Sequence, residues 1–341
     1  MRESPFTEEL RRLVDDLVDD RGDERGDDRG AAGGPGLWES LVGLGLPRIG
    51  VAEDRGGSGG SLADLLVVVE SLAGHGVGVP IVEASVADWV LGHTGPLADG
   101  LATLRLLDTA PEVVSGTVTA EVTFVPWARD AGRLVLCAPG AAPLLVDPAH
   151  PSVTVRTVDD IAGDPRDTVV LAGTPVTPLA EAPPYAEVRE RLALLWSAAV
   201  LGAARGAYRL TRTHVREREQ FGAPLVRIPE VAAHLARMRV QLVQAEAALA
   251  LARDGAPLGG GVDIARITTA AAATGIARIA HQLHGALGIT AEYPLHRLTR
   301  RLWSWRDAVA SERGWAEELG RRAGEAGESG VWTALTATGH G

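Results

Sequence analysis

The chain has 341 residues, a formal net charge of −11 and 46% hydrophobic residues, which is the composition of a globular protein with two or three domains. All 33 basic residues are arginines, so chemistry that needs a lysine amine, such as a Schiff base or a P-loop, is excluded. Cys137 is the one cysteine of the sequence, which excludes an intrachain disulfide and any metal site built from several thiolates.

Charge and hydropathy also limit the location and the partners. No apolar run approaches the roughly 20 residues that a membrane span requires, and the excess of negative charge disfavours a nucleic-acid partner. The nine histidines contain no His-x-x-x-His pair of the kind that binds zinc. We therefore expect a cytoplasmic protein without a membrane span, a nucleic-acid partner or a metal site.

Residues 1–100 are predicted to form an N-terminal helical domain. The first 36 residues carry eleven acidic residues and six arginines, and we expect residues 15–36 to be a loop or a disordered stretch. From Leu37 to about Gly95, apolar residues recur at helical spacing. The glycine-rich turn at residues 56–60 follows no predicted strand, so it is interpreted as a loop between helices and not as a dinucleotide-binding turn.

Residues 101–182 are predicted to form a small middle β domain, because the pattern changes to short runs of valine, threonine and leucine between proline, glycine and aspartate. The runs are Ser115–Val125, Arg133–Ala138, Leu144–Val146, Ser152–Val158 and Thr168–Leu171.

Residues 183–325 are predicted to form a C-terminal helical bundle, followed by a tail at residues 326–341. Pro229 is placed in the first turn of a helix over Val231–Arg253, and Asp263 is the expected N-cap of a helix over Ile264–Leu283. The fold class is therefore α+β with mostly helix.

Three stretches of the bundle carry a family resemblance. They are Arg216-Glu217-Arg218-Glu219-Gln220-Phe221-Gly222, Gln282-Leu283-His284-Gly285-Ala286-Leu287-Gly288 and Glu292-Tyr293-Pro294-Leu295. In this order they resemble the acyl-CoA dehydrogenase family, and the likeness extends over about residues 37–325. The resemblance implies an N-terminal helical domain, a middle β domain and a four-helix bundle, which agrees with the order predicted from periodicity.

In that family the Arg-x-x-Phe-Gly loop and the Gln-x-x-Gly stretch bind FAD, one from each of two neighbouring subunits. The resemblance therefore implies a FAD site made of Arg218, Gln220, Phe221, Gly222, Gln282, Gly285 and Gly288. These residue types suit the cofactor, because a guanidinium donates charge-assisted hydrogen bonds to a pyrophosphate and glycines let backbone N–H groups approach phosphate. Alternatively, Arg218 pairs with a neighbouring glutamate and Gly285 only ends a helix.

Family members remove the α-proton of an acyl thioester with a glutamate while the β-hydride passes to the flavin. Val309 occupies the commonest position of that glutamate and Leu192 occupies the second known position, so both usual positions are apolar. Asp307 and Glu312 lie near the first position, and Glu190 lies near the second. Either one of these carboxylates replaces the missing base, or all three make ordinary surface salt bridges.

Three functions are compatible with these features. The first is a FAD-dependent acyl-thioester dehydrogenase subunit whose base is supplied by a partner chain, as in heteromeric actinobacterial assemblies. The second is a self-sufficient dehydrogenase that uses Asp307 or Glu312, and the third is a flavin-free binding subunit or a non-redox enzyme. The family implies an acyl-CoA or carrier-bound acyl substrate, a homo- or hetero-oligomer, and either an electron-transfer flavoprotein or oxygen as the electron acceptor.

Three further residues have two interpretations each. His284 is expected to be a packed helix residue with a local partner, or else to contact the cofactor phosphate or the substrate. Trp303 and Trp305 are expected in the core or at a subunit interface, or else beside a nucleotide base.

Overall fold

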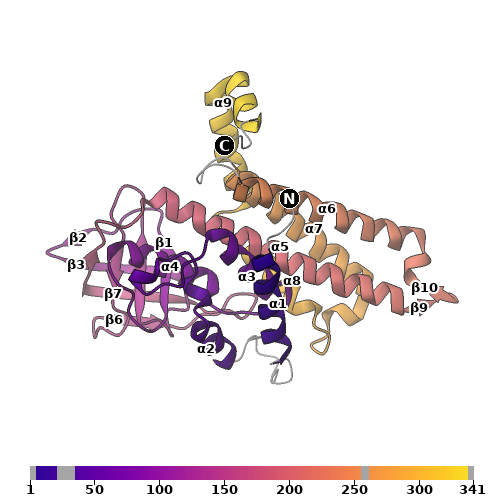
Figure 1. Cartoon of the computed structure of the whole chain (residues 1–341), viewed down its shortest axis with the longest axis horizontal. Helices are drawn as coiled ribbons and strands as arrows, with labels where there is room; N and C mark the ends of the chain where they lie inside the picture. The colour runs from indigo at the N-terminus through magenta and orange to yellow at the C-terminus, as the bar shows by residue number, and fades with distance from the viewer. Residues whose placement is uncertain (1–4, 21–34, 255–260, 337–341) are drawn as a thin grey trace. The chain divides into compact units, whose positions relative to one another are not determined.

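The computed structural model of the chain describes residues 5–20, 35–254 and 261–336. It divides into two compact units (Figure 1). Unit 1 contains the described residues up to Val68 and those of Gly78–Leu192, and unit 2 contains Val69–Val77 and the described residues from Ala193 onward.

The N-terminal part of unit 1 is helical, as predicted. Its elements are α1 (Pro5–Asp20), α2 (Pro35–Gly43), the short 3-10 helices η2 (Leu46–Arg48) and η3 (Glu53–Arg55), α3 (Leu62–Gly74), which continues into unit 2, and α4 (Ile81–Thr94). The glycine-rich residues 56–60 lie in the loop between η3 and α3, which confirms that interpretation.

Helix α1 corrects one prediction. The loop expected over residues 15–36 is wrong for residues 15–20, which form the last part of this helix. Leu10, Val14 and Val18 are buried at intervals of four residues, and this apolar stripe gives the acidic segment a face to pack, so that Asp16 and Asp19 stay on the exposed side. Residues 21–34 lie outside the described part of the chain, and Pro35 already begins α2.

The middle domain consists of two four-stranded sheets. The strands are β1 (Ala102–Leu106), β2 (Val113–Val114), β3 (Thr117–Pro126), β4 (Arg133–Cys137), β5 (Leu144–Val146), β6 (Val153–Arg156), β7 (Arg166–Pro175) and β8 (Thr177–Pro178). One sheet has the order β1-β4-β5-β8 with a parallel β1–β4 pair, and the other has the antiparallel order β2-β3-β7-β6. Valine and leucine side chains from β3, β4, β5 and β7 form one shared core, so the two sheets pack face to face.

Buried ion pairs attach α4 to this β domain. Glu83 of α4 accepts a 2.5 Å hydrogen bond from Arg166 of β7. One turn further along α4, Asp88 lies 3.5 Å from both Arg48 and Arg133. Each arginine thereby neutralises a carboxylate that would be costly to bury alone.

The C-terminal part of the chain forms the predicted bundle. Its elements are α5 (Tyr185–Glu217), β9 (Glu219–Gln220), β10 (Ala223–Pro224), η4 (Leu225–Arg227), α6 (Pro229–Asp254), α7 (Val262–His284), η5 (Gly285–Ile289), α8 (Leu295–Trp305) and α9 (Glu312–Thr336). Helix α7 packs against α6, α8 and α9, and α6 and α7 lie side by side (Figure 1).

Two boundaries of the bundle differ from the prediction. Helix α7 begins at Val262 with Gly261 as its N-cap, because the Asp263 carboxylate pairs with Arg322 of α9 and does not cap the helix. The tail expected at residues 326–341 is wrong for residues 326–336, since α9 continues to Thr336 across a non-helical Gly327. Residues 337–341 lie outside the described part of the chain.

Two glycines let α5 approach α3 closely within unit 2. A Cβ atom added at Gly202 would lie 2.1 Å from the Glu70 carbonyl oxygen, and one added at Gly206 would lie 2.3 Å from the Gly74 carbonyl oxygen. The backbones therefore touch where any side chain would hold them apart. None of the described helices is long and apolar enough to cross a membrane.

Candidate functional site

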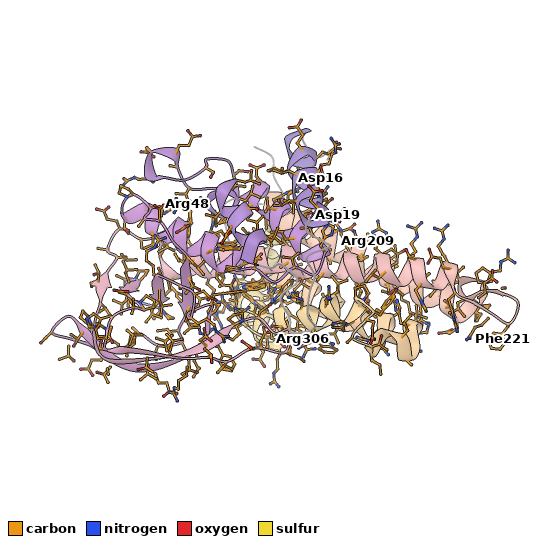
Figure 2. The ribbon with its side chains drawn as sticks, turned by 90° about the horizontal axis from the view of Figure 1, so that it is seen from below. Asp16, Asp19, Arg48, Arg209, Phe221 and Arg306 are labelled. Carbon is orange, nitrogen blue, oxygen red and sulfur yellow. The ribbon has the colours of Figure 1, made fainter. Side chains whose placement is uncertain are left out.

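The Arg-x-x-Phe-Gly stretch forms a hairpin directly after α5. Strands β9 and β10 pair around Phe221 and Gly222, and both of these residues have positive φ angles, 55° and 79°. A bulky side chain in the left-handed region costs roughly 1–2 kcal/mol. The Phe221 side chain is 93% exposed at the end of the hairpin (Figure 2), so this cost is offset by no packing within the described chain.

Arg218 links this hairpin to the last turn of α5. Its backbone N–H donates a 2.8 Å hydrogen bond to the His214 carbonyl, and its carbonyl accepts one of 2.9 Å from the Leu225 N–H. The Arg218 side chain is exposed, and its guanidinium makes no hydrogen bond or ion pair with another described residue. Gln220 is exposed as well. The alternative in which Arg218 pairs with a neighbouring glutamate is therefore absent from the described structure.

The Gln-x-x-Gly stretch lies at the C-terminal end of α7. Gly285 ends the helix with φ 59° and ψ −139°, a conformation that only glycine adopts readily. Gly285 therefore ends this helix, and its role toward the cofactor is a separate question. Gln282 is exposed and its amide has no partner among the described residues, whereas Gly288 is buried, and a Cβ atom there would lie 2.9 Å from His284 Cβ.

A histidine pair brings the two stretches together. The imidazole of His214 on α5 stacks on that of His284 on α7, with 4.4 Å between the ring centroids and 20° between the planes. The Arg218 hairpin and the Gly285 turn therefore lie at the same end of one chain's bundle. His284 is a packed residue with a local partner, as predicted, since its Nδ1–H donates to the Ala280 carbonyl at 2.8 Å.

The structure places no carboxylate at either usual position of the base. Leu192 is buried, and Val309 packs beside the buried side chains of Trp315 and Val262. Val309 has a φ of 74°, which is strained for a β-branched residue.

The candidate replacements are exposed or paired. Asp307 is 46% exposed and accepts a 2.9 Å hydrogen bond from Arg306 Nε, and Glu312 is exposed at the start of α9. Glu190, near the other position, is half-buried.

Arg266 fixes the backbone just before Val309, the residue at the commonest position of the catalytic glutamate. This buried side chain uses Nη2 to donate to the carbonyls of Trp305, Arg306 and Ala308, at 3.1, 2.7 and 3.1 Å. Burial lowers the pKa of its guanidinium to about 10, while the Asp307 charge acts in the opposite direction. The guanidinium of Arg266 thereby holds the end of α8 in place, and Arg266 itself is not a candidate base.

The two tryptophans differ in environment. Trp305 is buried against Trp196, with ring centroids 5.5 Å apart, so its placement in the core is confirmed. Trp303 is 37% exposed, and the Arg306 guanidinium lies 4.4 Å from its ring centroid. Within the described ranges, no group of three or more His, Cys, Asp or Glu residues could hold a metal ion.

Two family models match the chain. The acyl-CoA dehydrogenase N-terminal domain matches residues 3–96, and the acyl-CoA dehydrogenase C-terminal domain matches residues 188–305. The chain belongs to the acyl-CoA dehydrogenase family. Members of this family are FAD-dependent oxidoreductases that act on CH–CH groups. Both predicted FAD stretches lie within residues 188–305, whereas the middle β domain lies between the two matched ranges.

Curated relatives and solved structures agree with this membership. The chain is 29% identical to acyl-CoA dehydrogenase FadE34 of Mycobacterium tuberculosis over 78% of its length, although this match spans only 39% of FadE34. It is 28% identical to acyl-CoA dehydrogenase IpdE2 of the same organism, over 87% of this chain and 86% of the relative. The fold matches a chain of the ChsE4-ChsE5 complex from Mycobacterium tuberculosis with a TM-score of 0.81 and 21% identity, covering 95% of this chain and 98% of that one.

Sequence reasoning missed the residues that support these stretches. His214 lies one helical turn before Arg218, and this spacing was the signal that could have drawn attention to it. Arg266 and the ring contacts of Tyr293 had no comparable signal, because their partners lie on other helices.

Proposed function

We propose that this chain is the FAD-binding subunit of an acyl-thioester dehydrogenase that performs α,β-desaturation, and that a partner chain supplies the catalytic base. The observation that carries the proposal is a contrast within the bundle. At one end, Arg218, Gln282 and Phe221 are exposed without described polar partners, while both usual base positions are apolar and packed.

The residues at that end of the bundle fit FAD. An unpaired guanidinium suits the pyrophosphate, an unpaired amide offers both a donor and an acceptor, and an exposed phenyl ring in a strained turn suits a planar ring system. The Gly285 turn presents backbone without a side chain. We therefore assign Arg218, Gln220, Phe221, Gly222, Gln282, Gly285 and Gly288 to the cofactor.

In this function the bound FAD supplies the hydride acceptor for the β-carbon of the acyl group. The contribution of this chain would be to bind and orient the cofactor: Arg218 would pair with the pyrophosphate charge, and the exposed Phe221 ring would contact the cofactor. The α-proton needs a carboxylate, and the Asp307 carboxylate is 46% exposed and engaged by Arg306. In the proposed function the proton therefore goes to a carboxylate of the partner chain.

A partner chain is supported by the exposed apolar surface of the bundle. Val240 and Val243 of α6 are 56% and 47% exposed, and Ile289 beside the Gly285 turn is 75% exposed. Such surface suits an interface. The similar ChsE4 and ChsE5 proteins form a complex, and we infer a hetero-oligomer here as well, acting on an acyl-CoA or carrier-bound acyl group and passing electrons to an electron-transfer flavoprotein.

The test compares the chain alone with the chain co-expressed with a homologue that carries the family glutamate. The visible spectrum is recorded, and acyl-CoA thioesters are added under anaerobic conditions. The proposal expects bleaching of the flavin band for the co-expressed pair only. Bleaching by the pure chain that disappears in Asp307→Ala or Glu312→Ala would establish self-sufficient catalysis, and the absence of flavin from both samples would establish a flavin-free subunit.

A variant pair separates cofactor binding from folding. Phe221→Asn is expected to keep or raise stability, because asparagine accepts the left-handed turn that phenylalanine strains, while FAD affinity falls because the exposed ring is lost. Val240→Asn changes another exposed side chain in the same bundle and leaves FAD affinity unchanged in the isolated chain. Equal FAD affinity in wild type and Phe221→Asn would remove the hairpin from the cofactor site.

A further inference from the structure

Four histidines gather at the end of the bundle that carries both FAD stretches. His214 comes from α5, His281 and His284 from α7, and His296 from α8. The proposed function uses none of them directly. His214, His284 and His296 are linked to one another and to Tyr293 by ring contacts and hydrogen bonds.

This set of contacts begins at Arg218 and ends at Gly285. The Arg218 N–H donates to the His214 carbonyl, so these two residues share the last helical turn of α5. The His214 ring stacks on the His284 ring at 4.4 Å, and His284 is the residue directly before Gly285. The ring stack thus links the hairpin to the turn.

The His284 ring is held by hydrogen bonds at both nitrogens and by ring contacts. Its Nδ1–H donates to the Ala280 carbonyl at 2.8 Å, and its Nε2 accepts a 3.2 Å hydrogen bond from the Tyr293 hydroxyl. The Tyr293 ring itself lies 5.0 Å from the His284 ring. Gly288 lies close to the base of this side chain, where an added Cβ would lie 2.9 Å from His284 Cβ. Both ring nitrogens of His284 are therefore hydrogen-bonded.

Burial is the main reason why both imidazoles of the stack favour the neutral form. It lowers the pKa of His284 to about 4, with His214 and His281 acting in the same direction and the hydrogen bond to the Ala280 carbonyl opposing the shift. The pKa of His214 is lowered by burial and by Arg218, while Glu217 opposes the shift. A neutral His284 carries its proton on Nδ1, which leaves Nε2 as the acceptor that Tyr293 needs.

Two neighbouring groups complete this environment. His281 Nε2 contacts the Thr299 hydroxyl at 2.8 Å, and burial together with His296 lowers the pKa of His281. Burial and Glu217 raise the pKa of Tyr293, so its hydroxyl keeps the proton that it donates.

We infer that the His214–His284 stack, locked by the Tyr293 hydroxyl, is a positioning element that sets the distance between Arg218 and the Gly285 turn. The Arg218 hairpin and the Gly285 turn of one chain are then held in a preformed arrangement relative to each other. Preformation lowers the ordering cost of binding, because the two stretches need no mutual adjustment. The inference rests on the proposed function, since it assigns the stack a role in FAD binding.

The experiment titrates FAD into the full-length chain and follows quenching of flavin fluorescence, with thermal unfolding of the apoprotein as a second readout. Tyr293→Phe leaves a buried imidazole nitrogen without its donor, so we expect the Kd for FAD to rise about fivefold to tenfold. His284→Phe is expected to raise the Kd at least as much. His234→Phe is the matched control, since His234 donates to an i−4 carbonyl in the same way on α6, at 2.8 Å, outside the cluster.

The double variant distinguishes positioning from general damage. Removing both partners of one hydrogen bond leaves no unpaired atom, so the combined His284→Phe and Tyr293→Phe changes are expected to raise the Kd by less than the product of the single effects. Unchanged Kd values in both single variants, or a fall in apoprotein stability with the Kd unchanged, would overturn the inference while leaving FAD binding intact. A wild-type chain that binds no FAD would overturn this inference, and the absence of flavin from the co-expressed pair as well would overturn the proposed function.

Discussion

The contact between α5 and α3 makes a sharp prediction about glycine. At Gly206 an added Cβ would lie 2.3 Å from the Gly74 carbonyl oxygen and 2.9 Å from Leu298 Cδ2. Since real contacts of this kind exceed 3 Å, Gly206→Ala forces the two backbones apart by at least about 0.7 Å, an overpacking that costs roughly 1–3 kcal/mol. This cost exceeds the gain of about 1 kcal/mol that alanine brings within a helix.

Gly320→Ala on α9 is the matched control, because nothing lies within 4 Å of an added Cβ at that position. Thermal unfolding of the two variants should shift in opposite directions, with Gly206→Ala lower than wild type by several degrees and Gly320→Ala equal or higher. If alanine raised the unfolding temperature equally at both positions, the close approach of α5 to the end of α3 would be incorrect.

Three further outcomes are expected. Ser115→Asn should stabilise the chain by up to about 1 kcal/mol in chemical denaturation, because Ser115 (φ 50°) and Gly116 (φ 79°) form a two-residue hairpin turn that favours Asn-Gly; a loss of stability would contradict that turn. Glu83→Gln should cost up to about 3–5 kcal/mol because the largely buried Arg166 loses this carboxylate at 2.5 Å and keeps the longer contact with Asp160 at 3.6 Å, and Arg166→Met should restore part of the loss; an additive double variant would contradict the pairing. Because the folded state lowers the pKa of His284 to about 4, unfolding should become easier as pH falls from about 6.5 to 4, by no more than about 1.4 kcal/mol per pH unit from this group. His284→Phe should flatten that part of the stability profile, and an unchanged slope would show that His284 is not held neutral.

Periodicity was sufficient for most of the fold. The strand at Leu144–Val146 and the helix begun by Pro229 lie where the sequence predicts them, because local signals such as a short apolar run or a proline in the first turn act within a few residues. The errors arose where a residue from another helix determines which contact a side chain makes. Asp263 has the side chain of a good cap, yet Arg322 on another helix takes its carboxylate.

The candidate site was predictable in its residues but not in its construction. Motif spacing located Arg218 and Gly285, and the same counting located the apolar Val309 where a glutamate was expected. The stacking of His214 on His284 joins residues 70 positions apart, and no local pattern encodes it. The exposure of Asp307 likewise depends on Arg306 and on the Arg266 contacts that fix the end of α8.

The most direct test of the central claim is anaerobic reduction of the flavin by acyl-CoA thioesters, measured for this chain alone and for this chain with a glutamate-bearing homologue. The account predicts that the flavin band persists in the chain alone and bleaches in the pair. Bleaching in the pure chain, at a rate unchanged by the partner, would contradict it.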